Sequence, residues 1–374
     1  MIIKNVNIYR ETGEFEHGEI IIEGQFFAGA SSIAECDVLD AKGCYAIPGL
    51  IDIHLHGCIG NDFSTADTED CKKMLVFQAE NGITTICPTT LTLPENKLAK
   101  ACVNITAASD LKGSFIAGIH LEGPFFSYEK RGAQNPDYLK LPDEDMLLRL
   151  QTESNGKIKI VSIAPELKGA IEMINKLSSE IIFSIGHTQA DYETVTKAFE
   201  AGAKNVTHLW SCMPPFHHRQ PGVVGAARDF PDAYVEIICD SVHIHPGIVR
   251  ATLEMFGDNR VVMISDSLAG TGLKNGIYSL GGLEVEVNGS LAKLAGTDTI
   301  AGSVTTLMGC FQTAVKDMGI PLCSAVRCCT ENPAKALGMY DKIGSITPGK
   351  YADLVLLDKR LSVQSVILKG KHIK

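Results

Sequence analysis

The sequence predicts an α/β protein: a (β/α)8 barrel of the TIM type, together with a small β domain built from both chain termini. Two observations predict this fold. Short apolar segments alternate with helical stretches through the middle of the chain, and both ends consist of short alternating strands. Alternation of strands and helices is typical of parallel α/β folds. The chain has 374 residues, 45% hydrophobic and 21% charged, which is enough to bury a core of this size.

The two chain ends share one pattern. Apolar and polar residues alternate over residues 2–8 and 19–23, with glycines between the runs, and residues 352–358 and 363–369 have the same character. Alternation with a period of two residues predicts half-buried strands. We therefore predict a small β domain from residues 1–45 and 345–374, and a barrel from residues 46–344.

The middle of the chain contains eight apolar segments, which we predict to be the barrel strands. Strands that are covered on both faces by helices are almost continuously apolar, as these mostly are. The predicted strands are residues 46–56, 83–89, 115–122, 158–165, 181–187, 205–210, 234–243 and 261–266. Helical patterns fill the intervals, as over residues 69–82, 167–177 and 192–202, where Gly82 and Gly202 suit C-terminal glycine caps.

Eight strand-helix units favour a closed barrel. The alternative is an open doubly wound sheet, which should have a glycine-rich phosphate-binding turn after its first strand. Residues 52–57 read DIHLHG and do not form such a turn.

Composition excludes several classes of partner. A net charge of -10 and a pI near 5.6 make nucleic acid an unsuitable partner, and an anionic substrate would need local cations. The N-terminal residues lack the apolar stretch of a signal peptide or membrane span, so we expect a cytoplasmic protein without membrane contact. The 12 cysteines include no CxxC pair, and we expect most of them to be small buried hydrophobic residues.

Polar side chains stand where the predicted strands end. In a barrel of this type, catalytic residues gather at the C-terminal ends of different strands, so we expect these side chains to surround one mouth. They are His54, His56, Glu122, His187, His208, Asp240, His243 and Asp266.

His54 and His56 are two residues apart on a predicted strand and therefore share a face, which suits a metal site. The alternative is a pair of ordinary histidines on a half-buried face. Pro48 and Gly49 before the pair and Gly57 after it make that alternative less attractive.

Glu122, His187 and His208 offer one carboxylate and two imidazoles, a set that leaves an open coordination position, as catalytic metal sites do. Any one of them could instead be a hydrogen-bonded core residue, but three at matching strand ends are hard to explain in that way. Asp266 ends the last strand, where a carboxylate could take a proton from metal-activated water and return it to a leaving amine. Without the metal ligands, a helix cap or an ion pair would be the favoured interpretation of Asp266.

Several motifs match one known family. They are PGLIDIHLHG at residues 48–57, TTICPTT at 84–90, HLEGPF at 120–125, GHT at 186–188, THL at 207–209, PFHHRQPGVVGAA at 215–227, LGGL at 280–283, IAGS at 300–303 and GSITPGK at 344–350. On these motifs the chain resembles the N-acetylglucosamine-6-phosphate deacetylases of the amidohydrolase superfamily over nearly its whole length.

The resemblance implies specific roles. Glu122, His187 and His208 would hold a zinc or iron(II) ion, and Asp266 would be the acid-base residue. His54 and His56 would allow a second ion, although one ion suffices in some relatives.

The resemblance also implies a substrate site and a homodimer. Arg219 is expected to meet the sugar phosphate, with contact across the dimer interface as one arrangement, because a guanidinium fork suits phosphate. The implied substrate-binding residues are Ala133, Gln134, Ser211, Cys212, Arg219, Asp240, His243, Ile300, Ala301 and Gly302.

The chain departs from the commonest family pattern at four places. Gln134 stands where many members have histidine, and Ser241 replaces a glycine. Ser211 and Cys212 replace an Asn-Ala pair, and SDSL at residues 265–268 replaces TDAM. These positions line the substrate, so they leave the identity of the acylated amino sugar open.

The favoured function is hydrolysis of the N-acetyl group of N-acetylglucosamine 6-phosphate. The alternatives are N-acetylgalactosamine 6-phosphate or another N-acyl amino sugar phosphate. A cyclic-amide hydrolase is more distant, since related binuclear enzymes often use a lysine at the fourth strand, where residues 163–166 read IAPE. Outside the enzymes, a silent sugar-phosphate-binding protein is disfavoured because no metal ligand or acid-base residue is lost.

Overall fold

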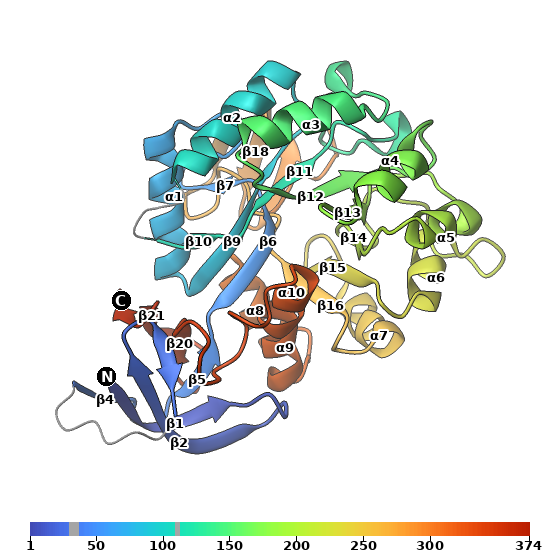
Figure 1. The fold of residues 1–374 in the computed structure, drawn as a ribbon. Coiled ribbons are helices and arrows are strands. Elements are labelled where there is room, and N and C mark those ends of the chain that lie inside the picture. Colours follow the sequence, from blue (N-terminus) through green and yellow to red (C-terminus); the bar gives the residue numbers. More distant parts are fainter. Residues whose placement is uncertain (30–36, 109–112) are drawn as a thin grey trace.

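Two sheets form the framework of the molecule. The computed structural model describes residues 1–29, 37–108 and 113–374, so residues 30–36 of the predicted terminal domain lie outside the described residues. A parallel sheet of nine strands forms the barrel, and a mixed sheet of eight strands is built from both termini (Figure 1). The predicted fold class is confirmed.

The terminal sheet joins the two ends of the chain. Its strand β5 pairs in parallel with β1 from the N-terminus and antiparallel with β20 from the C-terminus. Residues from both ends, such as Ile8 and Leu354, share a core of their own. The strands are β1 (Ile2–Tyr9), β2 (Phe15–Glu23), β3 (Phe26–Ala28), β4 (Val38–Asp40), β5 (Tyr45–Pro48), β20 (Leu354–Leu357), β21 (Val363–Leu368) and β22 (Lys371–His372).

The predicted strand over residues 46–56 is in fact two strands, so this prediction was wrong. β5 ends at Pro48 in the terminal sheet, and β6 (Leu50–Leu55) begins the barrel. Gly49 lies between them, where a Cβ atom would come within 2.1 Å of the Thr84 hydroxyl. The chain therefore changes sheets at a residue that has no side chain.

The barrel strands follow one another in parallel, as predicted, although the third is divided by a break at residues 117–118. They are β6, β9 (Ile83–Thr90), β10 (Phe115–Ile116), β11 (Ile119–Glu122), β12 (Ile158–Ile163), β13 (Ile182–Ile185), β14 (Asn205–Val206), β15 (Tyr234–Ile238) and β16 (Val261–Ile264). Backbone hydrogen bonds at the C-terminal ends of β16 and β6 join the last strand to the first. The Asp266 N–H donates to the carbonyl of His54 at 2.9 Å, and the His56 N–H donates to that of Ser267 at 2.8 Å.

Helices cover the outside of the barrel (Figure 1). In the described residues they are α1 (Thr68–Glu80), α2 (Glu95–Ala108), α3 (Glu144–Glu153), α4 (Ala170–Leu177), α5 (Tyr192–Glu200), α6 (Gly222–Asp229), α7 (Pro246–Phe256), α8 (Leu307–Lys316), α9 (Leu322–Cys329) and α10 (Glu331–Ala336). Gly82 and Gly202 follow α1 and α5 with positive φ, as the sequence predicts. Among these helices, none has the length and apolar character needed to cross a membrane. Most described cysteines are buried, as expected; Cys44, Cys212 and Cys323 are partly exposed.

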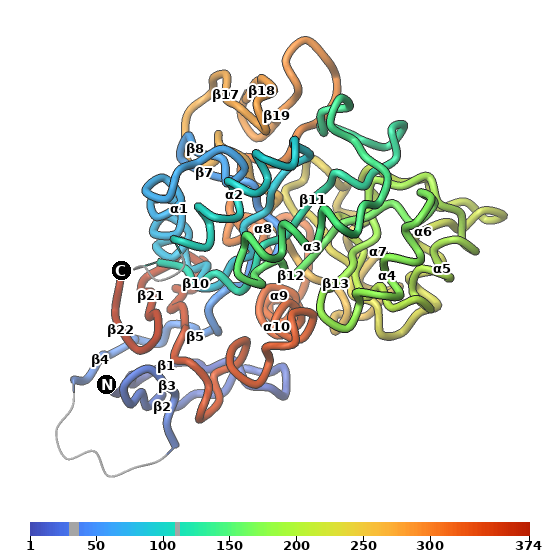
Figure 2. The backbone as a smooth tube through the Cα atoms, turned by 45° about the horizontal axis from the view of Figure 1, so that its top comes forward, coloured from blue at the N-terminus to red at the C-terminus, as the bar shows by residue number. Residues whose placement is uncertain are grey.

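A small antiparallel sheet was not predicted. It consists of β17 (Gly276–Leu280), β18 (Leu283–Asn288) and β19 (Leu291–Leu294), and we call residues 276–294 the cap sheet. Figure 2 shows it at one edge of the molecule, beyond β7 (Gly57–Cys58) and β8 (Asn61–Asp62). Gly281 and Gly282 form its first turn, both with positive φ. They stand between two segments in which apolar and polar residues alternate, a pattern that predicts a β-hairpin. The Gly281 N–H donates to the Asp62 carboxylate at 2.8 Å and so ties the cap sheet to the barrel mouth.

Candidate metal centre and active site

Two groups of possible metal ligands meet at the C-terminal mouth of the barrel. In each group, one ligand atom per residue lies within 4.8 Å of the others. The first group is Glu122, His187 and His208, and the second is His54, His56 and Asp266. All six side chains are buried, and they come from five different strands or the loops that follow them.

The first group brings three electron-rich atoms together. Oε1 of Glu122 lies 3.2 Å from Nε2 of His187 and 3.0 Å from Nε2 of His208, and these two nitrogens are 3.0 Å apart. His187 donates its Nδ1 proton to the Lys130 carbonyl at 2.9 Å, so the neutral ring directs its Nε2 lone pair at this group. A carboxylate oxygen and two imidazole nitrogens that face one another so closely fit a cation between them.

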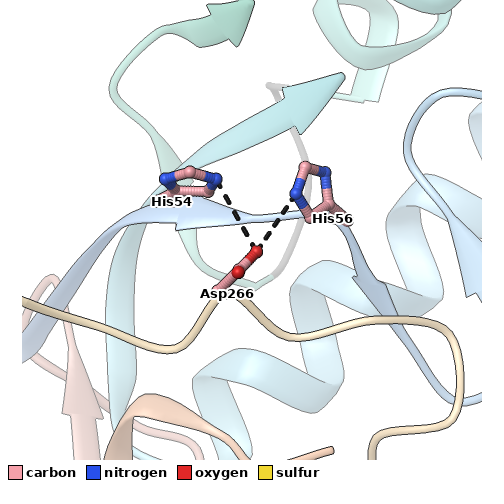
Figure 3. Close-up of side chains that lie close together, drawn as sticks. All are labelled: His54, His56 and Asp266. Atoms are coloured by element: carbon pink, nitrogen blue, oxygen red, sulfur yellow. Dashed lines mark ion pairs between the residues drawn. The ribbon is translucent and has the colours of Figure 1, made fainter. Parts of the chain in front are cut away.

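The second group lies on the other side of the same carboxylate. Figure 3 shows His54 on β6 and His56 directly after it, both directed at Asp266, with Oδ1 of Asp266 at 3.7 and 3.1 Å from their Nε2 atoms. Oε1 of Glu122 lies 3.3 Å from Nε2 of His54, and Oε2 of Glu122 lies 3.3 Å from Nε2 of His56. Glu122 therefore stands between the two groups, which suits a carboxylate shared by two ions.

Three of the six ligand candidates have strained backbone. His187, His208 and Asp266 have φ values of 50°, 28° and 50°, a region that non-glycine residues rarely adopt. Such residues cost roughly 1–3 kcal/mol each and gather at functional sites. Backbone bonds hold two of them: the carbonyl of His187 accepts the Ser127 N–H, and that of Asp266 accepts the Ser303 N–H at 2.7 Å. The turns bring these side chains to the mouth directly after their strands.

Burial and neighbouring groups shift the pKa values of the side chains in this site. Burial lowers the pKa of His54 and His56, but neighbouring carboxylates raise it by more, so that the pKa of His56 rises to about 9 and that of His54 lies well above its ordinary value. Burial raises the pKa of Glu122 and Asp266, but the neighbouring histidines lower both below their ordinary values. Protons on the imidazoles therefore balance two ionised carboxylates until a metal cation replaces them.

A cavity of about 440 Å³ opens beside these groups. Of the residues predicted from the sequence, it is lined by His56, Glu122, Ala133, Gln134, His187, His208, Ser211, Cys212, His243, Asp266, Ile300 and Gly302. Six further lining residues were not predicted from the sequence: Leu91, Gly132, Trp210, Leu280, Asp298 and Thr299. Trp210 is the only tryptophan of the chain and follows His208 closely, a position that could have pointed to it.

Four predicted residues do not line this cavity. His54 is fully buried beneath it, and Ala301 is buried in the core of the cap sheet. Asp240 lies behind His243 and accepts its Nδ1 proton at 2.8 Å. Arg219 is exposed in another cavity, where it contacts His218, so the structure does not bring it to the metal centre of its own chain.

Two of the departures from the family pattern have clear positions. Gln134 donates from Nε2 to Oε2 of Glu122 at 2.5 Å, and its Oε1 accepts the Thr92 N–H at 2.8 Å. It therefore contacts a metal-ligand candidate as well as the cavity. Ser241 is exposed with a φ of 63° and does not line the cavity.

Residues 45–373 match the amidohydrolase family. The chain belongs to this family. This amidohydrolase is 37% identical over 330 residues to an N-acetylglucosamine-6-phosphate deacetylase of Bacillus subtilis, a match that covers 87% of this chain and 83% of that protein. It is 33% identical to the human protein of the same name, over 100% of this chain and 93% of the relative.

Solved structures agree with these relatives. A mutant N-acetyl-D-glucosamine-6-phosphate deacetylase from Mycobacterium smegmatis, in complex with N-acetyl-D-glucosamine-6-phosphate, has a TM-score of 0.93 at 32% identity, covering 100% of this chain and 98% of that one. The enzyme from Thermotoga maritima has a TM-score of 0.89 at 29% identity, covering 100% and 99%. The resemblance expected from the sequence is confirmed. Family membership and the ligand groups together support a divalent metal in this amidohydrolase.

The raised pKa values predict that metal binding depends on pH. Ligation needs neutral imidazoles, so protons compete with the metal below the raised pKa of about 9 for His56, and metal affinity should fall as the pH falls. Calorimetric titration of metal-depleted protein with zinc, in buffers of different ionisation enthalpy, should show release of about one proton or more per ion near pH 7. An affinity that stays constant from about pH 6 to about pH 8, without proton release, would contradict this assignment of protons.

Proposed function

We propose that this chain hydrolyses the N-acetyl group of N-acetylglucosamine 6-phosphate, giving glucosamine 6-phosphate and acetate. The observation that supports this best is the Glu122, His187 and His208 group with Asp266 on the wall of the same cavity. Its relatives in bacteria and animals bear the name of that deacetylase.

The cofactor in this proposal is zinc or iron(II). Glu122, His187 and His208 would hold the first ion, and His54 and His56 a second, with Glu122 between them. Such an ion supplies a Lewis acid that polarises an amide carbonyl and makes water a better nucleophile at neutral pH. Mixed imidazole and carboxylate ligands suit both metals.

Asp266 is the proposed proton carrier. Its Oδ1 lies 3.1 Å from Nε2 of His56, and its pKa is below the ordinary value because the interactions with His56 and His54 outweigh the effect of burial. An ionised carboxylate on the cavity wall can take a proton from the attacking water and deliver it to the leaving nitrogen. His243 would bind substrate, since Asp240 holds its Nδ1 and leaves Nε2 free for a sugar hydroxyl.

The cavity has the size and lining for a small sugar. A volume of about 440 Å³ lies within the range of small-molecule sites. Leu91, Trp210, Leu280 and Ile300 provide apolar surface for the acetyl group and the sugar faces. The cap sheet contributes to this wall, so it helps to exclude water from the reacting amide.

A phosphate needs a cation that one chain does not supply to its cavity. None of the described residues that line it is lysine or arginine. Arg219 is exposed on a separate surface, with its guanidinium against His218. We therefore propose a homodimer in which Arg219 of one copy binds the phosphate held by the other copy. Cytoplasmic residence stays a prediction from the sequence.

N-acetylgalactosamine 6-phosphate is the second candidate substrate. Gln134, Ser211 and Cys212 depart from the common family residues, and all three line the cavity. A different arrangement of polar groups there could favour the other sugar epimer.

Acetate release tests the proposed function. Protein loaded with zinc or iron(II) should release acetate from N-acetylglucosamine 6-phosphate, should lose this activity on chelation, and should regain it when the metal is returned. The galactosamine epimer, assayed in parallel, identifies the preferred sugar. Fluorescence of Trp210 reports binding independently, because it is the only tryptophan and lines the cavity. Binding without acetate release from either sugar would favour a silent binding protein and contradict the proposal.

Asp266→Asn should retain substrate binding and the ion held by Glu122, His187 and His208, and should lose turnover. Asparagine keeps the size of the side chain but cannot accept the proton, so kcat should fall by about 10² to 10⁴, with little change in binding. Asp298→Asn is the matched control, since it also lines the cavity but its side chain is fully exposed. Normal metal content with more than about a tenth of wild-type turnover would refute the role of Asp266.

Arg219→Ala should raise KM for the phosphorylated substrate far more than for its dephosphorylated analogue, because the contact is to a remote phosphate. Arg228→Ala, also exposed and nearby in the chain, should have little effect. Mixed dimers of Arg219→Ala and Asp266→Asn chains distinguish the two arrangements. Contact across the interface restores one intact site per mixed dimer, and contact within one chain restores none. Equal losses on both substrates would exclude a phosphate role.

A further inference from the structure

Glu236 is a buried carboxylate outside the two ligand groups of the metal centre. It lies on β15, inside the barrel beneath the cavity, and is 1% exposed. Its Oε2 accepts two hydrogen bonds, from Nδ1 of His54 at 2.9 Å and from the backbone N–H of His208 at 3.1 Å. One oxygen therefore contacts a residue from each of the two ligand groups.

Glu236 also belongs to a third group of possible metal ligands, with His54 and His120. His120 has no nitrogen left for a metal. Its Nδ1 donates to the Ile53 carbonyl at 3.0 Å, and its Nε2 accepts from the Ser162 hydroxyl at 2.8 Å. With both nitrogens of His120 engaged, this group is a support for the site above it and no additional metal site.

The burial of Glu236 itself needs a reason. Its Oε1 has no hydrogen-bond partner among the described residues, and burying a carboxylate with an unpaired oxygen is unfavourable. A buried polar group with an unpaired oxygen calls for an explanation, such as a functional role or a bound ion or water. The two donors on Oε2 both belong to residues of the metal centre, which indicates where that function lies.

We infer that Glu236 is a positioning residue that makes His54 a metal ligand. A histidine that donates Nδ1–H to a carboxylate is held in one tautomer and orientation, and its Nε2 becomes a stronger ligand. Here Nε2 of His54 lies 3.3 Å from Oε1 of Glu122 and 3.7 Å from Oδ1 of Asp266, at the proposed position of the second ion. The same carboxylate oxygen holds the strained backbone of His208, whose φ is 28°.

The inference rests on the two-ion form of the proposed function and is tested with metal alone. Cobalt(II) titrated into metal-depleted full-length protein should bind as two ions per chain in the wild type. Glu236→Leu removes both the acceptor and the charge, so affinity for the second ion should fall about 100-fold. Glu236→Gln keeps an acceptor without the charge, so its affinity for the second ion should fall about tenfold. The cobalt(II) absorption spectrum should lose the contribution of the second site to a matching extent.

A matched control separates positioning from general loss of stability. Ser184→Ala removes another buried hydrogen bond of the barrel floor, the one between Ser184 and Thr207, and should leave binding of both ions unchanged. Thermal unfolding of each variant identifies any loss of fold. If Glu236→Leu does not fold, the smaller change of Glu236→Gln is the test.

Each outcome is decisive. Unchanged affinity for the second ion in a folded Glu236 variant would overturn the inference, and so would a wild-type protein that never binds more than one ion. Acetate release by a one-ion protein would leave the deacetylase proposal intact. Two-ion binding that depends on Glu236, in a protein that hydrolyses neither sugar, would support the inference and contradict the proposed substrate.

Discussion

The carboxylate of Glu122 is the interaction on which the rest of the site depends. Its two oxygens lie within 3.3 Å of Nε2 atoms from four histidines, and almost no water reaches them. A buried carboxylate needs compensating positive charge. Protonated imidazoles provide this charge without a metal, and a bound metal ion would provide it when the imidazoles are neutral. The barrel makes this possible because its strands end around one mouth. Backbone hydrogen bonds of Asp266 and Ser267 with His54 and His56 join the last strand to the first at the same place, so the barrel closes beside the ligand groups.

Support around Glu122 has two layers in the structure. Gln134 holds Oε2 from the cavity side, and Glu236 orients His54 from below. The contacts of the residues that depart from the family pattern indicate what each departure affects. Gln134 contacts the metal-ligand candidate directly, so its identity bears on the metal as well as on the sugar. Ser241 is exposed, so its cost is mainly one of backbone conformation, because a serine at a φ of 63° adopts a region that suits glycine.

The sequence predicted the barrel and the positions of the ligand candidates because both leave local signals. Buried parallel strands are continuous apolar runs, and the polar residues that end them stand out. Glu236 left no such signal, since a single polar residue inside a strand does not reveal whether it faces the barrel interior or the helices. The cap sheet had a readable turn at Gly281 and Gly282, but alternation along the chain does not show which surface a hairpin covers. The role of Arg219 could not be read from one chain, because in the proposed homodimer its phosphate contact depends on a second copy.

Metal affinity of Glu122→Gln tests the central claim most directly. Glutamine has the same shape, so the fold should survive, but the negative charge between the two ligand groups is removed. The dissociation constant for zinc, measured by competition with a chelator, should rise by at least about 100-fold relative to the wild type, with the unfolding temperature little changed. Wild-type zinc affinity in a folded Glu122→Gln protein would contradict the role of this carboxylate as the group that joins the metal centre.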